Sequence, residues 1–202
     1  QITAMSGFSS TLHAVAIGEI EYYGYEEGSG SLDTTLKSVY NVPATTGTQL
    51  EVYYDAKGES TVQSPIPDLS PNTNTGALST SPPTLDTTDG IDSFKFNGSS
   101  QYITSTHGLS VPGQPIHSQC VWFKTTGDTG DYQYISVIGT TSANQHAAII
   151  IQDDGRTLIG SYFGGDRKMI TITPNVWYHV ALVYTGTTTD AAKYYINGEE
   201  VI

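Results

Sequence analysis

Two glutamates stand two residues apart in "GEIEYYG", the stretch of this sequence that comes nearest to acid–base chemistry. Side chains at positions i and i+2 of a β-strand point to the same face, so Glu19 and Glu21 could line one cleft. Retaining hydrolysis of a glycosidic bond needs a nucleophile and a separate acid about 5–5.5 Å apart. The simpler interpretation, which we favour, is a pair of solvent-facing glutamates on an ordinary strand.

Residue types for other reactions are present, but without the spacing that those reactions require. No Gly-x-Ser-x-Gly segment marks a nucleophilic serine. No glycine-rich loop matches a phosphate-binding motif. The five histidines show neither H-x-H nor H-x-x-x-H metal spacing; they are His13, His107, His117, His146 and His179. We therefore predict that the protein is not an enzyme.

The composition predicts an all-β protein. The 202 residues include 14 tyrosines and 21 glycines, together with many threonines and serines, which favour strands and turns over helices. The net charge of −12 argues against binding to nucleic acid or anionic membranes. The longest uniformly apolar run, Ala147–Ile151, is far too short for membrane insertion. Cys120 is the only cysteine, so no intrachain disulfide is possible.

Short segments rich in β-branched and aromatic residues follow one another at intervals of 8 to 12 residues, which is typical of a β-sandwich. We expect the first strand at Leu12–Tyr25 and another at Gln49–Asp55, with a loop or arm at Gln1–Ser10. Eight of the nine prolines lie between Pro43 and Pro115, so much of that region should run over the surface.

The second half carries a series of recognisable segments: "FKFNGSSQYIT", "SQCVWFKT", "IIIQDDGRTLIGSYFG" and "VWYHVALVYTGTTTDAAKYYINGEEV". Together with the upstream "EVYYDAKGESTVQSPIPDLSPNTNTGAL", they resemble a laminin-G/pentraxin-type domain over Gln49–Ile202. The resemblance implies a concanavalin A-like jelly-roll β-sandwich of two antiparallel sheets. We accordingly divide the chain into an N-terminal arm and strand (1–31), a connecting segment (32–48) and the jelly roll (49–202).

Within these segments we expect structural roles. Trp177 should lie in the core with Val180 and Leu182, because a tryptophan supplies a large apolar area. His179 should be a packed, hydrogen-bonded histidine. Asn197-Gly198 predicts a hairpin with a type I′ turn, in which both central residues have positive φ.

Concanavalin A-like folds also include glycoside hydrolases, and "GEIEYYG" resembles the glucanase motif E-[ILV]-D-x-x-E. The family's acid follows the first glutamate by four or five residues, where this chain has Tyr23 and Gly24. Glu21 stands where the motif has its aspartate, between its two glutamates. A degenerate or true glycoside hydrolase is therefore the least favoured alternative.

The resemblance also implies Ca²⁺ as the one candidate cofactor. Pentraxin-like domains place their first acidic ligands in the loop after "VWFKT", which here supplies Asp128 and Asp131. The family's second ligand group follows the Y-x-N-G hairpin beyond residue 202, so these aspartates would form half of such a site. We interpret Asp153 and Asp154, in "QDDGR", as a plain β-turn.

Sugar binding would need an exposed aromatic ring beside hydrogen-bonding groups. The best candidates are Tyr132 and Tyr134 beside Asp131, or Tyr162 and Phe163 before the Gly164-Gly165-Asp166 turn. The alternative for each is a tyrosine that simply covers the sheet.

The family normally ends in further strands of alternating apolar and acidic residues, and the N-terminal "AVAIGEIEYYGY" has that character. We expect this segment to fill the terminal-strand position, or to be the tail of a preceding unit in a tandem array. The run from Ala16 to Ala56 also resembles segments of virion proteins of large algal DNA viruses.

These resemblances lead to a functional hypothesis. We expect a non-catalytic module on a virion surface or otherwise extracellular, as a surface or minor capsid component that contacts cell-surface glycans of a host. Its partners would be other virion subunits or repeats of the same chain. A purely structural assembly module is the main alternative, since Val176–Tyr184 is apolar on both faces.

Overall fold

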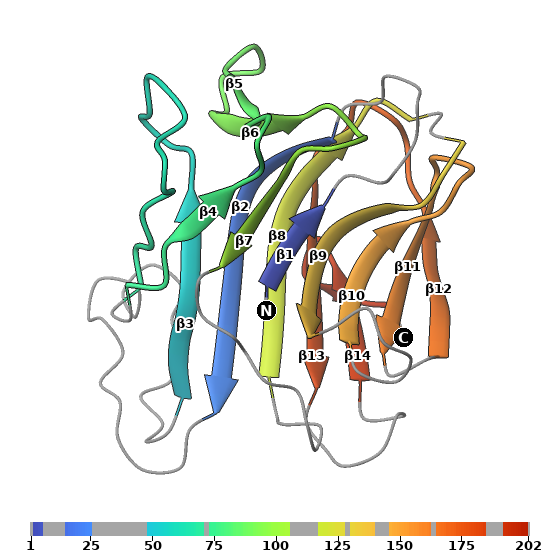
Figure 1. Ribbon diagram of the computed structural model, residues 1–202. Helices are drawn as coiled ribbons and strands as arrows, with labels where there is room; N and C mark the ends of the chain where they lie inside the picture. Colours follow the sequence, from blue (N-terminus) through green and yellow to red (C-terminus); the bar gives the residue numbers. More distant parts are fainter. Residues whose placement is uncertain are drawn as a thin grey trace.

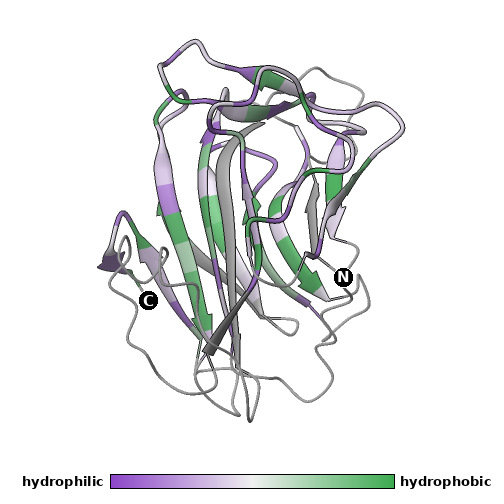
Figure 2. Ribbon diagram, turned by 90° about the vertical axis from the view of Figure 1, so that its left-hand side faces the viewer, coloured by the Kyte–Doolittle hydropathy of each residue, from purple (hydrophilic) through white to green (hydrophobic). Residues whose placement is uncertain are grey.

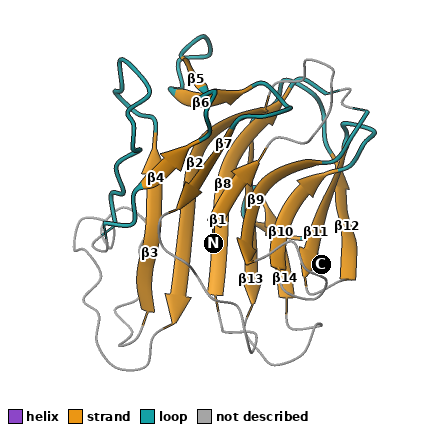
Figure 3. Ribbon diagram, viewed as in Figure 1, coloured by secondary structure: helices purple, strands orange, loops and turns teal. Residues whose placement is uncertain are grey.

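The protein is a two-layer β-sandwich in the computed structural model, and no helix occurs among its described residues (Figure 3). The structure describes residues 2–5, 15–25, 48–70, 73–105, 117–127, 130–139, 146–162, 165–184 and 192–201. Side chains are described from Glu51 onward, except at 162 and 165–168. All strand pairs in this part are antiparallel, which confirms the predicted fold class. The same part contains no helix that is long and apolar enough for a membrane crossing.

One layer is a sheet of seven described strands in the order β12-β11-β10-β9-β1-β7-β4. Its strands are β1 (Ile2–Met5), β4 (Gly76–Leu78), β7 (Tyr102–Ser105), β9 (Gln133–Gly139), β10 (His146–Ile151), β11 (Thr157–Tyr162) and β12 (Gly165–Thr171).

The other layer is a sheet of eight described strands in the order β15-β14-β13-β8-β2-β6-β5, with β3 also paired to β2. Its strands are β2 (Val15–Tyr25), β3 (Thr48–Asp55), β5 (Thr84–Asp86), β6 (Ser93–Phe96), β8 (His117–Thr125), β13 (Tyr178–Tyr184), β14 (Ala192–Ile196) and β15 (Glu199–Glu200).

Alternating residues divide β8, a long strand of the eight-stranded sheet, into a buried and a more exposed set, and bands of hydropathy mark the described strands (Figure 2). In β8, Gln119, Val121 and Phe123 are fully or almost fully buried, whereas Trp122 between them is 40% exposed. This is the two-residue period of a strand that has one face on a core. The face of this sheet that points away from the core is called the outer face below.

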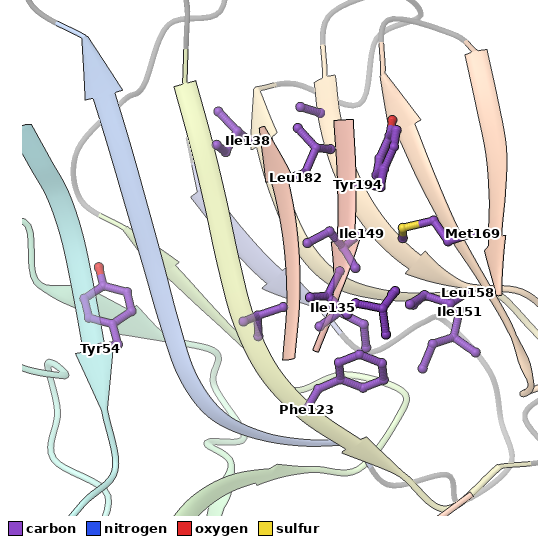
Figure 4. Packing of buried hydrophobic residues seen from close by; sticks show 14 of the residues in the cluster. Tyr54, Phe123, Ile135, Ile138, Ile149, Ile151, Leu158, Met169, Leu182 and Tyr194 are labelled. Atoms are coloured by element: carbon purple, nitrogen blue, oxygen red, sulfur yellow. The ribbon is translucent and has the colours of Figure 1, made fainter. Parts of the chain in front are cut away.

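The core fills the space between the sheets (Figure 4). Leu182 and Tyr194 on one sheet face Ile149 and Met169 on the other, and each such large side chain contributes roughly 1.5–3 kcal/mol when it is buried. The sheets are also joined inside the core by a polar contact, in which the Ser136 hydroxyl donates to Gln119 Oε1 at 2.8 Å.

Val180 and Leu182 lie in the core as predicted, but the prediction for Trp177 was wrong. Trp177 is only partly buried and does not belong to the core cluster. Its position has the same strand parity as His179, and therefore the opposite parity to Val180 and Leu182. Lys124, across the strand pair on the outer face, covers its ring.

The N-terminal segment enters both sheets. β2 lies between β8 on one side and β3 and β6 on the other, while β1 lies between β9 and β7 (Figure 1). Of the stretch expected as a loop or arm at Gln1–Ser10, Ile2–Met5 is a strand, and the rest lies outside the described residues. The segment expected as a strand at Leu12–Tyr25 is described as a strand from Val15. β2 is therefore in the same sheet as β13, one strand away from it.

The Asn197-Gly198 turn has the predicted conformation. The two φ angles are 51° and 86°, as a type I′ turn requires. The Asn197 side chain accepts a hydrogen bond from the His179 backbone N–H at 2.9 Å, and the Asn197 N–H donates to the His179 carbonyl at 2.8 Å. The turn thus fixes the backbone of β13 beside the outer face.

Asp68 organises the loop that follows β3. Its carboxylate accepts hydrogen bonds from the backbone N–H groups of Tyr53, Ser70 and Asn74 at 2.6–2.9 Å, and from the Ser70 hydroxyl. The Tyr54 hydroxyl donates to the Asn74 carbonyl at 2.5 Å. The segment that resembled a family opening turn is therefore a carboxylate-centred loop anchored on β3.

Gly160 provides a test of how the sheets pack. A Cβ atom at this position would overlap the ring of Tyr194, which comes from the opposite sheet. We expect Gly160→Ala to lower the free energy of unfolding by about 1–3 kcal/mol, as overpacked cores do. Urea denaturation measures this change. The double variant Gly160→Ala/Tyr194→Leu should be less destabilised than the sum of the two single changes, so strict additivity would contradict the contact.

Tyr54 predicts a pH dependence at alkaline pH. Burial, followed in smaller measure by the negative charge of Asp68, raises the pKa of Tyr54 from 10.0 to about 12. Because the folded state favours the neutral phenol, this stabilisation is complete below pH 10 and is lost as the pH rises from about 10 to about 12.

We expect Tyr54→Phe to lower stability at pH 7 by about 1 kcal/mol, since the Asn74 carbonyl loses its donor. The same change should reduce the alkaline loss of stability, as measured by denaturation curves between pH 8 and 12. Tyr195→Phe, on the outer face, is the matched control and should keep that loss. An alkaline loss unchanged in Tyr54→Phe would contradict this assignment.

Candidate functional site

The candidate site is the outer face of the eight-stranded sheet, where four strands present polar and aromatic side chains to solvent. Strand register places its members side by side, because directly opposite residues of antiparallel strands share a face. The described members used below are Tyr53 and Asp55 of β3, Cys120, Trp122 and Lys124 of β8, His179 of β13, and Lys193 and Tyr195 of β14.

Trp122 is the central feature of the outer face. It lies near the middle of β8 rather than in a loop, and 40% of it is exposed to solvent. His179 lies directly opposite it, with ring centroids 5.2 Å apart and planes inclined by 49°. Because the Asn197 turn holds the backbone of His179, the His179 ring supports one side of a fixed indole platform.

A second aromatic ring lies further along the same face. The Lys124 ammonium stands 5.4 Å from the centroid of the Trp177 ring, a cation–π contact, and also forms an ion pair with Asp89. Lys124 therefore covers Trp177 and leaves Trp122 as the more open of the two indoles.

Polar groups flank Trp122 on both sides. On β3, the Tyr53 hydroxyl donates to Asp55 Oδ2 at 3.2 Å. On the other side, Glu200 Oε2 accepts hydrogen bonds from Lys193 Nζ at 3.0 Å and from the Tyr195 hydroxyl at 3.3 Å. The hydrogen bond and charge of Glu200 raise the pKa of Lys193. A ligand on the indole would thus meet carboxylate and phenol oxygens on either side.

The two glutamates of "GEIEYYG" occupy register positions on this face. Glu19 lies directly opposite Trp122 on β8 and Asp55 on β3, and Glu21 lies opposite Cys120. Two strand spacings separate Trp122 from Asp55, roughly 10 Å. The register thus brings segments that are remote in the sequence to one surface.

The predicted metal loop lies at one end of the sandwich. Asp128 is outside the described residues, and Asp131 Oδ1 accepts a hydrogen bond from the Tyr132 N–H at 2.9 Å. Neighbouring loops meet it there: the Gly130 N–H donates to the Asp153 carbonyl at 3.0 Å, and Pro174 packs over Gly127. No group of three possible metal ligands occurs within the described residues, and the calcium half-site stays a prediction.

Asp153 and Asp154 belong to the β10–β11 hairpin, as predicted. Asp154 accepts hydrogen bonds from the N–H groups of Arg156 and Thr157 and from the Thr157 hydroxyl, at 2.6–2.8 Å. Gly155 takes a positive φ of 66°. The Asp154 carboxylate is thus occupied in holding its own turn.

The described members of the two alternative aromatic pairs lie apart in the seven-stranded sheet. Tyr132 is 40% exposed at the start of β9, whereas Tyr134 packs against a second apolar cluster that includes Val137 and Ile150. Tyr162 ends β11 and pairs with Ala147, so it lies at the opposite end of the sheet from Tyr132. The Tyr162 side chain and Phe163 lie outside the described residues.

A comparison with protein families decides which fold family this is. The model described as "Concanavalin A-like lectin/glucanases superfamily" matches residues 97–202, just over half of the chain. The chain belongs to this superfamily. No curated protein and no solved structure matches it significantly.

Membership in the concanavalin A-like superfamily covers both lectins and glucanases, as the family description states. The match begins at Asn97 and so includes β8, β13 and β14 of the outer face but not β2 or β3. The family comparison therefore supports a carbohydrate-binding or structural module in general, and the outer face gives that module a specific candidate surface.

Trp122 was not among the residues predicted from the sequence, although a signal for it was present. In "HSQCVWFKT", Trp122 has the parity of Ser118, Cys120 and Lys124, while Val121 and Phe123 alternate with it. That pattern places the tryptophan on the polar side of a strand. Asp55 was missed because its position on this face depends on the pairing of β3 with β2.

The Asp154 turn yields a prediction about calcium. We expect Asp154→Ala to lower stability by about 1 kcal/mol, because three hydrogen bonds of an exposed turn are lost. Thermal unfolding should show the same decrease in EDTA and in calcium. Arg156→Ala, which removes an exposed side chain of the same turn and keeps the backbone donor, is the matched control, with a change within about 0.5 kcal/mol. A decrease in Asp154→Ala that depends on calcium would mean that Asp154 is a metal ligand.

Proposed function

We propose that the protein is a non-catalytic carbohydrate-binding module whose ligand lies on the outer face, over Trp122. The observation that carries this proposal is an indole 40% exposed near the middle of a strand, in a superfamily that includes lectins. An exposed aromatic ring with convergent polar groups is the usual chemistry of a sugar site, because the ring packs against C–H groups while hydroxyls bond the flanking oxygens.

The charges of the outer face favour an uncharged glycan. Three described lysines lie on this side of the eight-stranded sheet, and each is paired with a carboxylate: Lys95, the exposed residue of β6, with Asp86, Lys124 with Asp89, and Lys193 with Glu200. The chain as a whole carries a net charge of −12. A sulfated or sialylated ligand would therefore have to displace existing ion pairs in a negative field.

The non-catalytic part of the proposal rests on the spacing of acids around Glu19. Tyr23 and Gly24 occupy the positions where a glucanase would carry its acid. Turnover of a β-glucan by the native chain that disappears in Glu19→Gln would overturn this part while leaving open whether Trp122 holds the sugar.

A structural assembly module is the second candidate. In its favour, the outer face of β13 also carries Ala181 and Val183, and Val176 just before the strand is 42% exposed. A position on a virion surface, with host glycans and other virion subunits as partners, stays a prediction from the sequence resemblance.

The decisive experiment is a glycan array with the native chain and Trp122→Ala. We expect binding to neutral glycans that falls about five- to thirtyfold in Trp122→Ala, because one stacked ring contributes on the order of 1–2 kcal/mol. Circular dichroism should show that the variant keeps its fold. Tyr102→Ala, which removes a ring of similar exposure (37%) from the other sheet, is the matched control.

The remaining outcomes separate the alternatives. Binding lost in Tyr132→Ala and in EDTA, but kept in Trp122→Ala, would move the site to the loop that contains Asp131. No glycan signal under any condition would favour the assembly module.

A further inference from the structure

The described strands fall into two groups whose backbone ladders are connected through the N-terminal segment. The first group, residues 48–105, contains β3 to β7, and the second, residues 117–200, contains β8 to β15. Every described ladder stays within one group, except those that involve β1 or β2. In Figure 1 the blue strands lie between the teal and green strands and the yellow-to-red ones.

β2 makes the longer of the two junctions. It pairs with β8 from Val15 opposite Thr125 to Gly24 opposite His117, and with β3 on its other edge. β1 repeats the arrangement in the second sheet, between β7 and β9. Without residues 1–25, both sheets would have unpaired edges in their middle, which is a strong drive to recapture a strand.

We call the position that β2 occupies between β8 and β3 the slot. A strand that fills it must alternate between residues for the core side and residues for the outer face. Ile20 and Glu21 occupy successive register positions opposite Val121, which is buried in the core, and Cys120, which belongs to the outer face. A second copy of this chain carries the same segment in the same register. It is therefore the occupant that fits the slot without any new interface.

We propose that residues 1–25 act as an exchangeable arm, which in one copy of the chain can close the sheets of a second copy. The backbone hydrogen bonds are the same whether the arm comes from the same chain or from another. The free energies of the exchanged and unexchanged forms therefore differ mainly through the concentration of the chain. Residues 26–47 connect the arm to β3, and a connection of this length sets an effective concentration of about 1 mM. Arms stay in their own chain in dilute solution and exchange where copies are concentrated.

The only cysteine of the chain supplies a probe of the arm. Glu21 lies directly opposite Cys120, and directly opposite residues of antiparallel strands are close enough for a disulfide. We expect the variant Glu21→Cys, refolded at about 10 μM under mild oxidation, to form an intrachain disulfide and migrate as a monomer. Tyr22→Cys, shifted by one position and hence to the other face, is the matched control and should not form it.

Exchange is then tested by mixing two chains of different tag length. One carries Glu21→Cys with Cys120→Ser, and the other is native with Cys120, so neither can form a bond within itself. After joint unfolding and refolding, we expect the mixed disulfide dimer to exceed both same-chain dimers, and its share to rise about fiftyfold, from about 1% at about 10 μM to about 50% at about 1 mM. Non-reducing electrophoresis measures all three products.

Each other result overturns the proposal. Mixed and same-chain dimers in random proportion would indicate collision of exposed thiols, and the absence of any disulfide in Glu21→Cys would refute the β2–β8 register. Light scattering on the native chain, refolded at about 1 mM and diluted, needs no substitution. Dimers or longer chains that persist support exchange, and monomers at every concentration exclude it.

Discussion

The backbone ladder between β2 and its neighbours is the interaction on which the rest of this structure depends. Every strand needs partners for its N–H and C=O groups, and β8 and β3 find them on the two edges of β2. The core between the layers is continuous across the two strand groups, but it closes only because this ladder holds the groups in register. Backbone pairing, rather than any single side-chain contact, therefore sets the shape of the outer face.

The register of that ladder also assembles the candidate site. Asp55 and Trp122 are 67 residues apart in the sequence (122 − 55), and they share a face because each lies directly opposite Glu19, on either side of β2. A bulge in β2 between Ile17 and Glu19 sets this register. A slip of one residue would exchange the two faces of β2, so the site and the core depend on the same pairing.

Local chemistry explains what could be predicted from the sequence. The Asn197-Gly198 turn and the Asp154 turn were predicted correctly, because positive φ and short-range hydrogen bonds are decided by adjacent residues. Trp177 was assigned to the core because its size outweighed its parity. The separation of Tyr132 from Tyr162, and the insertion of β1 and β2 into the sheets, depend on strand order, which no local pattern encodes.

The ion pair between Lys124 and Asp89 bears both on how the two strand groups are held together and on the charge of the outer face. It is a polar side-chain contact between the two strand groups, and it also neutralises a cation on the outer face. A surface pair of this kind adds little stability, about 0–1 kcal/mol, so its larger effect is on the local field. Lys124 is held over Trp177 and against Asp89, and Lys193 is paired with Glu200, so the described strand residues of the outer face include no unpaired lysine. The open indole of Trp122 has carboxylates on both sides, those of Asp55 and Glu200. Such a surface disfavours polyanions through the same contacts that order it, and the proposed preference for uncharged sugars would follow from the fold.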